Sequence, residues 1–236
     1  MRIRKLRLII AVSYTHLKYF NRNIYLIPGL KTVDSDFTFV NNMRGEEIEV
    51  VGAIDELKDK CGGDSFAMIL PGSHTHVTYI EKDKIAGIIS NFTGELFHAL
   101  KEQTIMSPVL SAEVKELDKD MVKKGMDNLE TFGINRSLYI AHAMRIFNHG
   151  SEKERFSYAE GVINGGVRKS LEYFCEHFWH ECSTIAIISN EFMYNLFSII
   201  FQDSKYIKNI IWPVSYTHLC LHGYQLYLDL CKKVNA

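Results

Sequence analysis

The chain has 236 residues, of which 47% are hydrophobic, and a formal net charge of −1 at pH 7. These values are typical of a globular protein with one large or two modest domains, and they lack the basic excess of a nucleic-acid-binding protein. No apolar stretch is long enough to predict a membrane span. The five cysteines do not have the spacing of a disulfide framework, so we expect reduced thiols in a cytoplasmic protein.

The hexapeptide VSYTHL occurs twice, at residues 12–17 and 214–219, with nothing alike around the two copies. A structural repeat would extend over a whole unit at a short period, so this pair needs another origin. One reading frame of the transposon end used in sequencing libraries encodes these six residues. That frame requires the preceding codon to end in CT, which permits only Ser, Pro, Thr or Ala, and the residues before the two copies are Ala11 and Pro213. We interpret both copies as library-construction scars. Synonymous codons within either copy in the nucleotide sequence would exclude this interpretation.

This interpretation sets the expected organisation of the chain. Residues 1–17 are an artefactual tail and scar, residues 18–213 are the natural fragment, and residues 214–236 are a scar and a chimeric tail. We therefore assign no function to the tyrosines and histidines of the two copies, which are Tyr14, His16, Tyr216 and His218.

The first elements of the natural fragment are a strand and a helix. The run NIYLIPGL at residues 23–30 is rich in β-forming residues and stops at a Pro-Gly pair, after which a polar loop runs through Asp34 and Asp36. Apolar residues then recur at helical spacing from Ile48 to Leu57. This spacing predicts a helix that begins near Gly45.

Residues 64–90 contain a buried strand broken by Pro71-Gly72, an alternating strand, a polar connection at residues 81–84 and another apolar run. This pattern predicts a β-hairpin whose first strand ends in a tight glycine turn. In the following segment, NFTGELFHALKEQ, Thr93 can cap a helix and Glu95 lies in its first turn.

Residues 111–182 carry a series of amphipathic helical segments, at residues 111–130, 137–147 and 157–182. A short apolar strand at residues 183–189 and a helix at residues 190–202 follow. Because strands and helices mix throughout, we expect an α/β or α+β domain.

The turn LPGSHTHV is the first candidate site. Glycine allows close approach of the backbone, so the N–H groups and hydroxyls of Gly72, Ser73, His74 and Thr75 could bind a phosphate. Most Pro-Gly turns are only turns, so this signal is weak by itself.

The segment MRGEE, where a loop enters the expected helix, is the second candidate. The residues are Arg44, Glu46 and Glu47. Two carboxylates behind an arginine could supply a general base and a clamp for an anionic substrate. A carboxylate at a helix start is more often only a cap, and these residues alone favour that simpler interpretation.

The segment CEHFWHEC resembles a metal site in composition only. On a helix, Cys175 and Cys182 fall on one side while His177 and His180 lie roughly opposite. We therefore expect buried thiols and aromatic packing, and we expect no metal site.

Four segments in this order resemble the 2-dehydro-3-deoxygalactonokinase family: IYLIPGL, NNMRGEEIEVVGA, ILPGSHTHV and NFTGELFHALKEQTIM. The family shows a similar strand ending in PGL, an MRGEE segment, an LPGTH-like turn and an MTGEL helix start. The match is dense from Ile24 to Met106 and thins towards Pro213.

The resemblance implies part of an actin-like ATPase (ribonuclease H-like) α/β fold, mostly its C-terminal domain. It also implies ATP with magnesium as cofactors and phosphoryl transfer to a six-carbon keto-deoxy sugar acid, 2-dehydro-3-deoxy-D-galactonate. By the order of the family's motifs, Glu46 resembles the general base, with Glu47 as the alternative. Arg44 could pair with the substrate carboxylate or the transferring phosphate. Residues 72–75 resemble the second phosphate loop.

The same resemblance implies that the sugar-acid pocket is lined by Thr93, Gly94 and Glu95. The family's N-terminal strand, its first phosphate loop and its magnesium-binding aspartate have no counterpart here, and Ser189-Asn190 stands where a glycine-rich adenosine turn is expected. We therefore expect a kinase fragment that is inactive by itself, since phosphoryl transfer depends on positioning and charge neutralisation. The alternative is a non-catalytic sugar-acid-binding domain.

Overall fold

The computed structural model describes residues 6–7, 27, 29–213 and 217–234. The strand expected at residues 23–30 therefore lies mostly outside the described residues, as do the first VSYTHL copy and residues 214–216 of the second. Three short strands form a small antiparallel sheet in the order β1-β2-β3. They are β1 (Leu6–Arg7), β2 (Leu30–Thr32) and β3 (Asn42–Met43).

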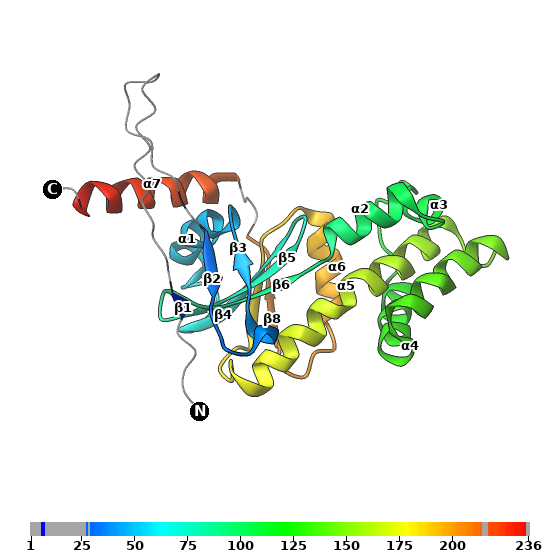
Figure 1. The fold of residues 1–236 in the computed structure, drawn as a ribbon, viewed down its shortest axis with the longest axis horizontal. Helices are drawn as coiled ribbons and strands as arrows, with labels where there is room; N and C mark the ends of the chain where they lie inside the picture. Colours follow the sequence, from blue (N-terminus) through cyan, green and yellow to red (C-terminus); the bar gives the residue numbers. More distant parts are fainter. Residues whose placement is uncertain (1–5, 8–26, 28, 214–216, 235–236) are drawn as a thin grey trace, which may run out of the picture.

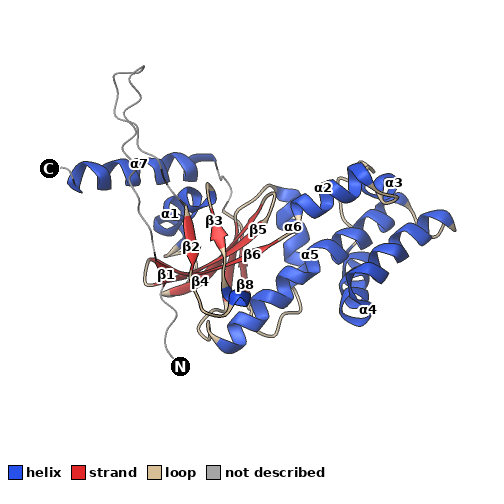
Figure 2. Ribbon diagram, in the orientation of Figure 1, coloured by secondary structure: helices blue, strands red, loops and turns tan. Residues whose placement is uncertain are grey.

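The central sheet has five strands, β4 (Ser65–Pro71), β5 (Thr75–Glu81), β6 (Lys84–Asn91), β7 (Thr184–Ile187) and β8 (Asn209–Ile211). Their order is β6-β5-β4-β7-β8 (Figures 1 and 2). The first three are antiparallel neighbours, as the predicted hairpin requires, whereas β7 is parallel to β4 and β8 is parallel to β7. The sheet is thus mixed and the α/β expectation is confirmed.

Helices cover both faces of this sheet. Alternate side chains of a strand point to opposite faces, and in β4 all five residues from Phe66 to Leu70 are buried. Phe66, Met68 and Leu70 pack towards α1 (Glu46–Leu57), which begins where predicted. Ala67 and Ile69 pack towards α5 (Glu152–His177) and α6 (Glu191–Phe201). Because both faces are buried, β4 is apolar almost without interruption.

The helix α7 (Thr217–Val234) packs outside α1, as Figure 1 shows. A Cβ atom added to Gly52 would lie 2.0 Å from the Leu219 carbonyl oxygen, so the two backbones nearly touch. Leu219 is fully buried in the same core as α1. The origin of residues 214–236 stays a prediction.

A helical part extends from one end of the sheet (Figure 1) and contains α2 (Gly94–Gln103), α3 (Ser107–Leu110), α4 (Lys119–Ile146) and the first half of α5. The helix expected from residue 111 begins later, at Lys119, because the Asp118 side chain accepts a hydrogen bond from the Met121 N–H and caps it. The helices expected at residues 111–130 and 137–147 join into α4 across a kink at Gly133, whose φ is 73°.

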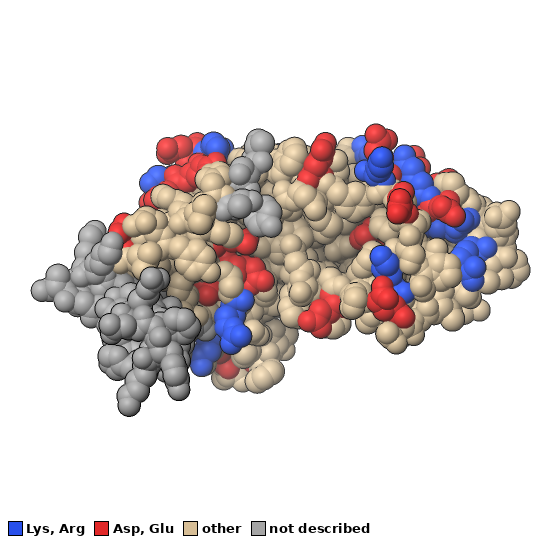
Figure 3. Space-filling model, turned by 90° about the horizontal axis from the view of Figure 1, so that it is seen from above, with Lys and Arg blue, Asp and Glu red and all other residues tan. Residues whose placement is uncertain are grey.

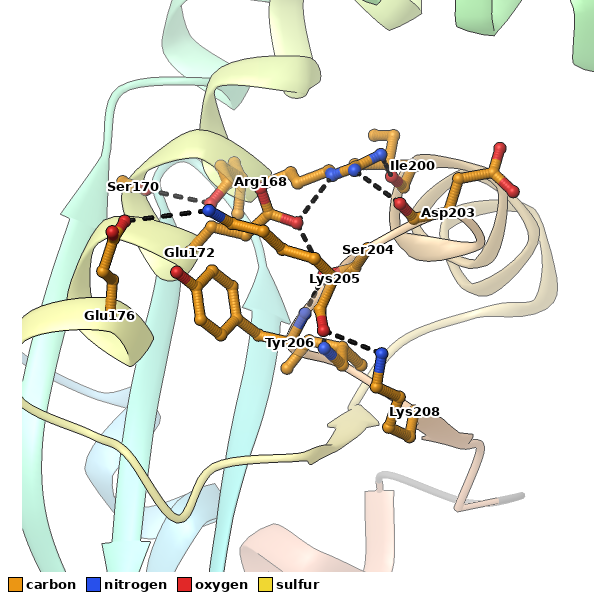
Figure 4. A network of polar contacts seen from close by, with 12 residues as sticks. Arg168, Ser170, Glu172, Glu176, Ile200, Asp203, Ser204, Lys205, Tyr206 and Lys208 are labelled. Carbon is orange, nitrogen blue, oxygen red and sulfur yellow. Dashed lines mark hydrogen bonds and ion pairs between the residues drawn. The ribbon is translucent and has the colours of Figure 1, made fainter.

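One polar network joins α5, α6 and the loop that leads to β8 (Figure 4). The Arg168 guanidinium donates to the Glu172 carboxylate at 3.0 Å and to the carbonyl oxygens of Ile200 and Asp203 at the end of α6. The Ser204 hydroxyl donates to the same carboxylate at 2.6 Å and accepts the N–H groups of Tyr206 and Ile207. The cation therefore satisfies carbonyls at a helix C-terminus, where positive charge is favoured.

No helix of the described part of the chain is long and apolar enough to cross a membrane.

Candidate active site

The MRGEE segment forms a turn that leads from β3 into α1. Gly45 is the residue before the helix and has a φ of 113°, which side-chain-bearing residues rarely adopt. The Glu47 carboxylate accepts a hydrogen bond from the Gly45 N–H at 2.5 Å. Arg44 precedes this turn and is exposed.

The two glutamates of this turn have different surroundings. Glu47 is 1% exposed, and burial raises the pKa of its carboxyl above the ordinary value, against the opposing hydrogen bond from Gly45. The Glu47 side chain therefore caps the start of α1 by accepting the N–H of the residue before the helix. Glu46 is half-buried, and its Oε2 atom is inaccessible to solvent without a hydrogen-bond partner among the described residues. That atom lies 3.9 Å from Nε2 of His76 on β5.

His76 is 4% exposed and is held from the opposite side of its ring. Its Nδ1 lies 3.0 Å from the Ser90 hydroxyl on β6, and that hydroxyl donates to the Asn42 carbonyl on β3 at 2.9 Å. Burial lowers the pKa of His76, while the Glu46 carboxylate opposes this effect. Three strands and the start of α1 thus meet at this side chain.

The predicted phosphate turn connects β4 and β5 and contacts the start of α2. The Glu95 N–H donates to the Ser73 carbonyl at 2.8 Å. A Cβ atom added to Gly94 would lie 2.1 Å from the Gly72 carbonyl oxygen, so glycine is required for this approach. The turn and the helix start therefore form one unit.

Thr93 does not cap α2 through its side chain, although it stands at the N-cap position. Its hydroxyl is instead 2.7 Å from the Thr75 hydroxyl, and both side chains are buried. The expectation of a Thr93 cap was wrong because a buried hydroxyl on the neighbouring strand offers a partner that sequence does not reveal.

The structure brings the predicted segments together at one end of the sheet. Thr75 and His76 are consecutive on β5 and point to opposite faces, so the strand joins the Thr93 contact on one side to the Glu46 contact on the other. His74 and His76 lie on the same side with ring centroids 6.0 Å apart. His76 and Ser90 were not predicted, although the alternation of His74 and His76 was a visible signal.

The CEHFWHEC segment agrees with the expectation of buried thiols. Cys175 and Cys182 are both buried, and hydrogen bonding between them together with burial raises the pKa of Cys182. His177 and His180 are exposed. The helix ends at His177 instead of continuing to Cys182. Among the described residues, no group of three His, Cys, Asp or Glu side chains could hold a metal ion.

The charged surface is mixed in sign. Figure 3 shows lysine, arginine and acidic side chains interleaved over the helical part.

Comparisons with known proteins agree on one family. The sequence profile described as 2-keto-3-deoxy-galactonokinase matches residues 8–211. A protein of Rhizobium meliloti (strain 1021) assigned as a 2-dehydro-3-deoxygalactonokinase is 34% identical over 98 residues, 42% of this chain and 30% of that protein. The 2-dehydro-3-deoxygalactonokinase of Escherichia coli (strain K12) is 25% identical over 156 residues, 66% of this chain and 50% of that protein.

A crystal structure of a Sinorhizobium meliloti protein assigned to the same enzyme class has a TM-score of 0.70 and 20% sequence identity, and the match covers 87% of this chain and 65% of that chain. This likeness shows a shared fold. The chain spans between about a third and half of the length of the curated relatives it matches.

Proposed function

Because this chain belongs to the 2-keto-3-deoxy-galactonokinase family, we propose that its site serves ATP-dependent phosphorylation of a keto-deoxy sugar acid, 2-dehydro-3-deoxy-D-galactonate. The observation that supports this most is the meeting of MRGEE, the glycine turn and the start of α2 at one end of the central sheet. Such a site offers a carboxylate, an arginine and a backbone turn, which are among the parts that phosphoryl transfer uses.

We also infer that the sheet belongs to the ribonuclease H-like domains of actin-like ATPases, and mostly to the C-terminal domain. The strand order β6-β5-β4-β7-β8 supports this, since three consecutive antiparallel strands are followed by two parallel ones. The helical part is then an insertion between β6 and β7.

In this proposal Glu46 is the general base that accepts the proton of the substrate hydroxyl. Its position at the first residue of α1 and its partly exposed side chain favour it over Glu47, which is buried and whose carboxylate already accepts the Gly45 N–H. Arg44, exposed beside this turn, pairs with the substrate carboxylate or the transferring phosphate.

The turn of residues 72–75 is the proposed phosphate site. Gly72 and Ser73 are exposed, and no hydrogen bond between described residues uses their N–H groups. This donor set fits a phosphate oxygen. ATP with magnesium supplies the transferable phosphoryl group when bound; we assign no side chain to the ion.

The residues at the start of α2 have two different roles in this proposal. Gly94 and Glu95 line the sugar-acid pocket, whereas the Thr93 hydroxyl fixes the phosphate turn through Thr75. We place the protein in the cytoplasm, as its free cysteines favour.

Measurement of ADP release in the presence of the sugar acid and ATP tests this function, with ligand binding followed in parallel because low turnover is expected from this chain. Glu46→Gln should keep binding and lower any turnover by about 10²- to 10⁴-fold, since it removes the base. The matched control is Glu116→Gln, an exposed carboxylate elsewhere. Near-normal turnover in Glu46→Gln would reject Glu46 as the base, and binding of the sugar acid without binding of ATP would favour a binding domain.

A further inference from the structure

The contact between Glu46 and His76 contains an unusual feature. Oε2 of Glu46 is hidden from solvent and has no hydrogen-bond partner within the described part of the chain. Nε2 of His76 is 3.9 Å away, which is longer than a hydrogen bond but short enough for a strong charge interaction in a buried site. Buried polar atoms are almost always paired, so this orphan oxygen requires an explanation.

Ser90 determines which nitrogen of His76 carries the proton. A hydroxyl has a single hydrogen, and that of Ser90 is donated to the Asn42 carbonyl at 2.9 Å. The same oxygen is 3.0 Å from Nδ1 of His76, so both contacts are satisfied only when the hydroxyl accepts the Nδ1–H. The neutral ring consequently presents a bare Nε2 lone pair to the Glu46 carboxylate.

Two lone pairs that face each other repel, and one added proton turns this contact into an attraction. We propose that His76 is a positioning residue for Glu46, and that the Glu46–His76 pair stores between Oε2 and Nε2 the proton removed from the substrate hydroxyl. The orphan oxygen is then the position at which that proton is held against Nε2 of His76.

This inference rests on the proposed phosphoryl transfer. In that step the O–H bond of the sugar acid breaks and its proton passes to Glu46 and His76. The alkoxide oxygen forms a bond to the terminal phosphorus of the nucleoside triphosphate, while the bond to the leaving diphosphate breaks with its electron pair. The stored proton returns to solvent after product release, so atoms and charges balance.

Other described charged groups lie around the pair. His74 lies beside His76 and disfavours a second positive charge, while Arg44, Glu47 and Glu49 lie near Glu46 at the start of α1. Burial lowers the pKa of His76, and the negative charge of the Glu46 carboxylate partly opposes this effect.

Nitrogen-15 NMR of the histidine rings in this chain tests the inference without any need for turnover. We expect the signals of neutral His76 to show a protonated Nδ1 and a bare Nε2. Ser90→Ala removes the acceptor, so the proton should move to Nε2 and donate to Glu46. Glu46→Gln should move the midpoint of the His76 titration to lower pH, because the carboxylate that favours the charged ring is gone.

Glu116→Gln is the matched control and should leave the His76 signals unchanged, while exposed His177 and His180 serve as internal references. A protonated Nε2 in the unaltered chain, or an unchanged His76 titration in Glu46→Gln, would overturn the inference. Where turnover is measurable, His76→Gln should lower kcat by about ten-fold or more with little change in KM. Failure of the unaltered chain to bind the sugar acid or ATP, with the NMR result intact, would instead count against the proposed kinase function.

Discussion

At the residue scale, Glu46 and Glu47 show how one turn gives two neighbouring carboxylates different roles. Glu47 points inward, accepts the Gly45 N–H and is buried, whereas Glu46 lies at the surface of the turn opposite His76. The sequence left both as candidates for the base, because an adjacent pair at a helix start gives no sign of which side chain turns inward. The burial of the two side chains distinguishes them.

Substitution of each glutamate by alanine should separate these roles. Glu47→Ala leaves the Gly45 N–H without its acceptor and opens a gap, so we expect a loss of about 1–3 kcal/mol in the free energy of unfolding. Glu46→Ala removes an oxygen that has no described hydrogen-bond partner and should change stability by less than about 0.5 kcal/mol. Urea denaturation measures both, and equal losses would contradict the assignment of Glu47 as the cap.

Glu160 in α5 predicts a dependence of stability on pH. It is 5% exposed, and burial raises its pKa from 4.5 to about 7, against one hydrogen bond from Asn164. The folded state therefore binds more protons than the unfolded chain between these two values, and stability falls as pH rises through that window.

We expect the free energy of unfolding to drop by up to about 3 kcal/mol between pH 4.5 and pH 7 from this group alone. Glu160→Gln keeps the side-chain size without the charge and should flatten the decline. Thermal denaturation at a series of pH values measures this. A decline of the same size in the variant would assign it to other groups.

At the scale of elements, the contact of α4 with α5 depends on glycines. A Cβ atom at Gly161 would lie 2.1 Å from the Val122 carbonyl oxygen, and one at Gly125 would lie 2.2 Å from the Tyr158 carbonyl oxygen. The two helices therefore pack with their backbones in near contact. This contact fixes α4 against α5.

Gly161→Ala should separate the two helices and lower the free energy of unfolding by about 1–3 kcal/mol, the usual cost of overpacking. Gly166 lies in the same helix with open space around it, so Gly166→Ala should stabilise the protein by up to about 1 kcal/mol through helix propensity. Denaturation curves of the two variants should move in opposite directions. A shift of both in the same direction would contradict the packing.

At the scale of the whole molecule, local patterns predicted the meander β4–β5–β6 and the start of α1, because alternation, helical spacing and turn residues are local signals. Strand β8 was missed because three residues carry little pattern, and its identity comes from pairing with β7. Gly133 has non-helical dihedral angles (φ 73°, ψ 172°), so α4 consists of two helical segments, in agreement with the two helices expected from sequence. By contrast, His76 could not be assigned to the site, because Glu46 and Ser90 reach it from distant parts of the chain.

The whole molecule arranges a candidate base, an arginine and the proposed phosphate turn at one end of a mixed sheet, with a helical part attached through α2. These parts come from segments up to about fifty residues apart in sequence, and strand pairing brings them together. The arrangement is what a sugar-acid kinase would use to hold its substrate beside ATP.

The most direct test of this account is calorimetric titration of the chain with 2-dehydro-3-deoxy-D-galactonate. We predict saturable binding that Glu46→Gln preserves and that Arg44→Ala weakens by about ten-fold or more, since a charge-assisted contact to a carboxylate contributes about 1.5–3 kcal/mol. Arg136→Ala, which removes an exposed arginine from α4, should leave the affinity unchanged. No detectable binding would contradict the proposed sugar-acid site, and equal affinity in Arg44→Ala would exclude Arg44 as the partner of the sugar-acid carboxylate.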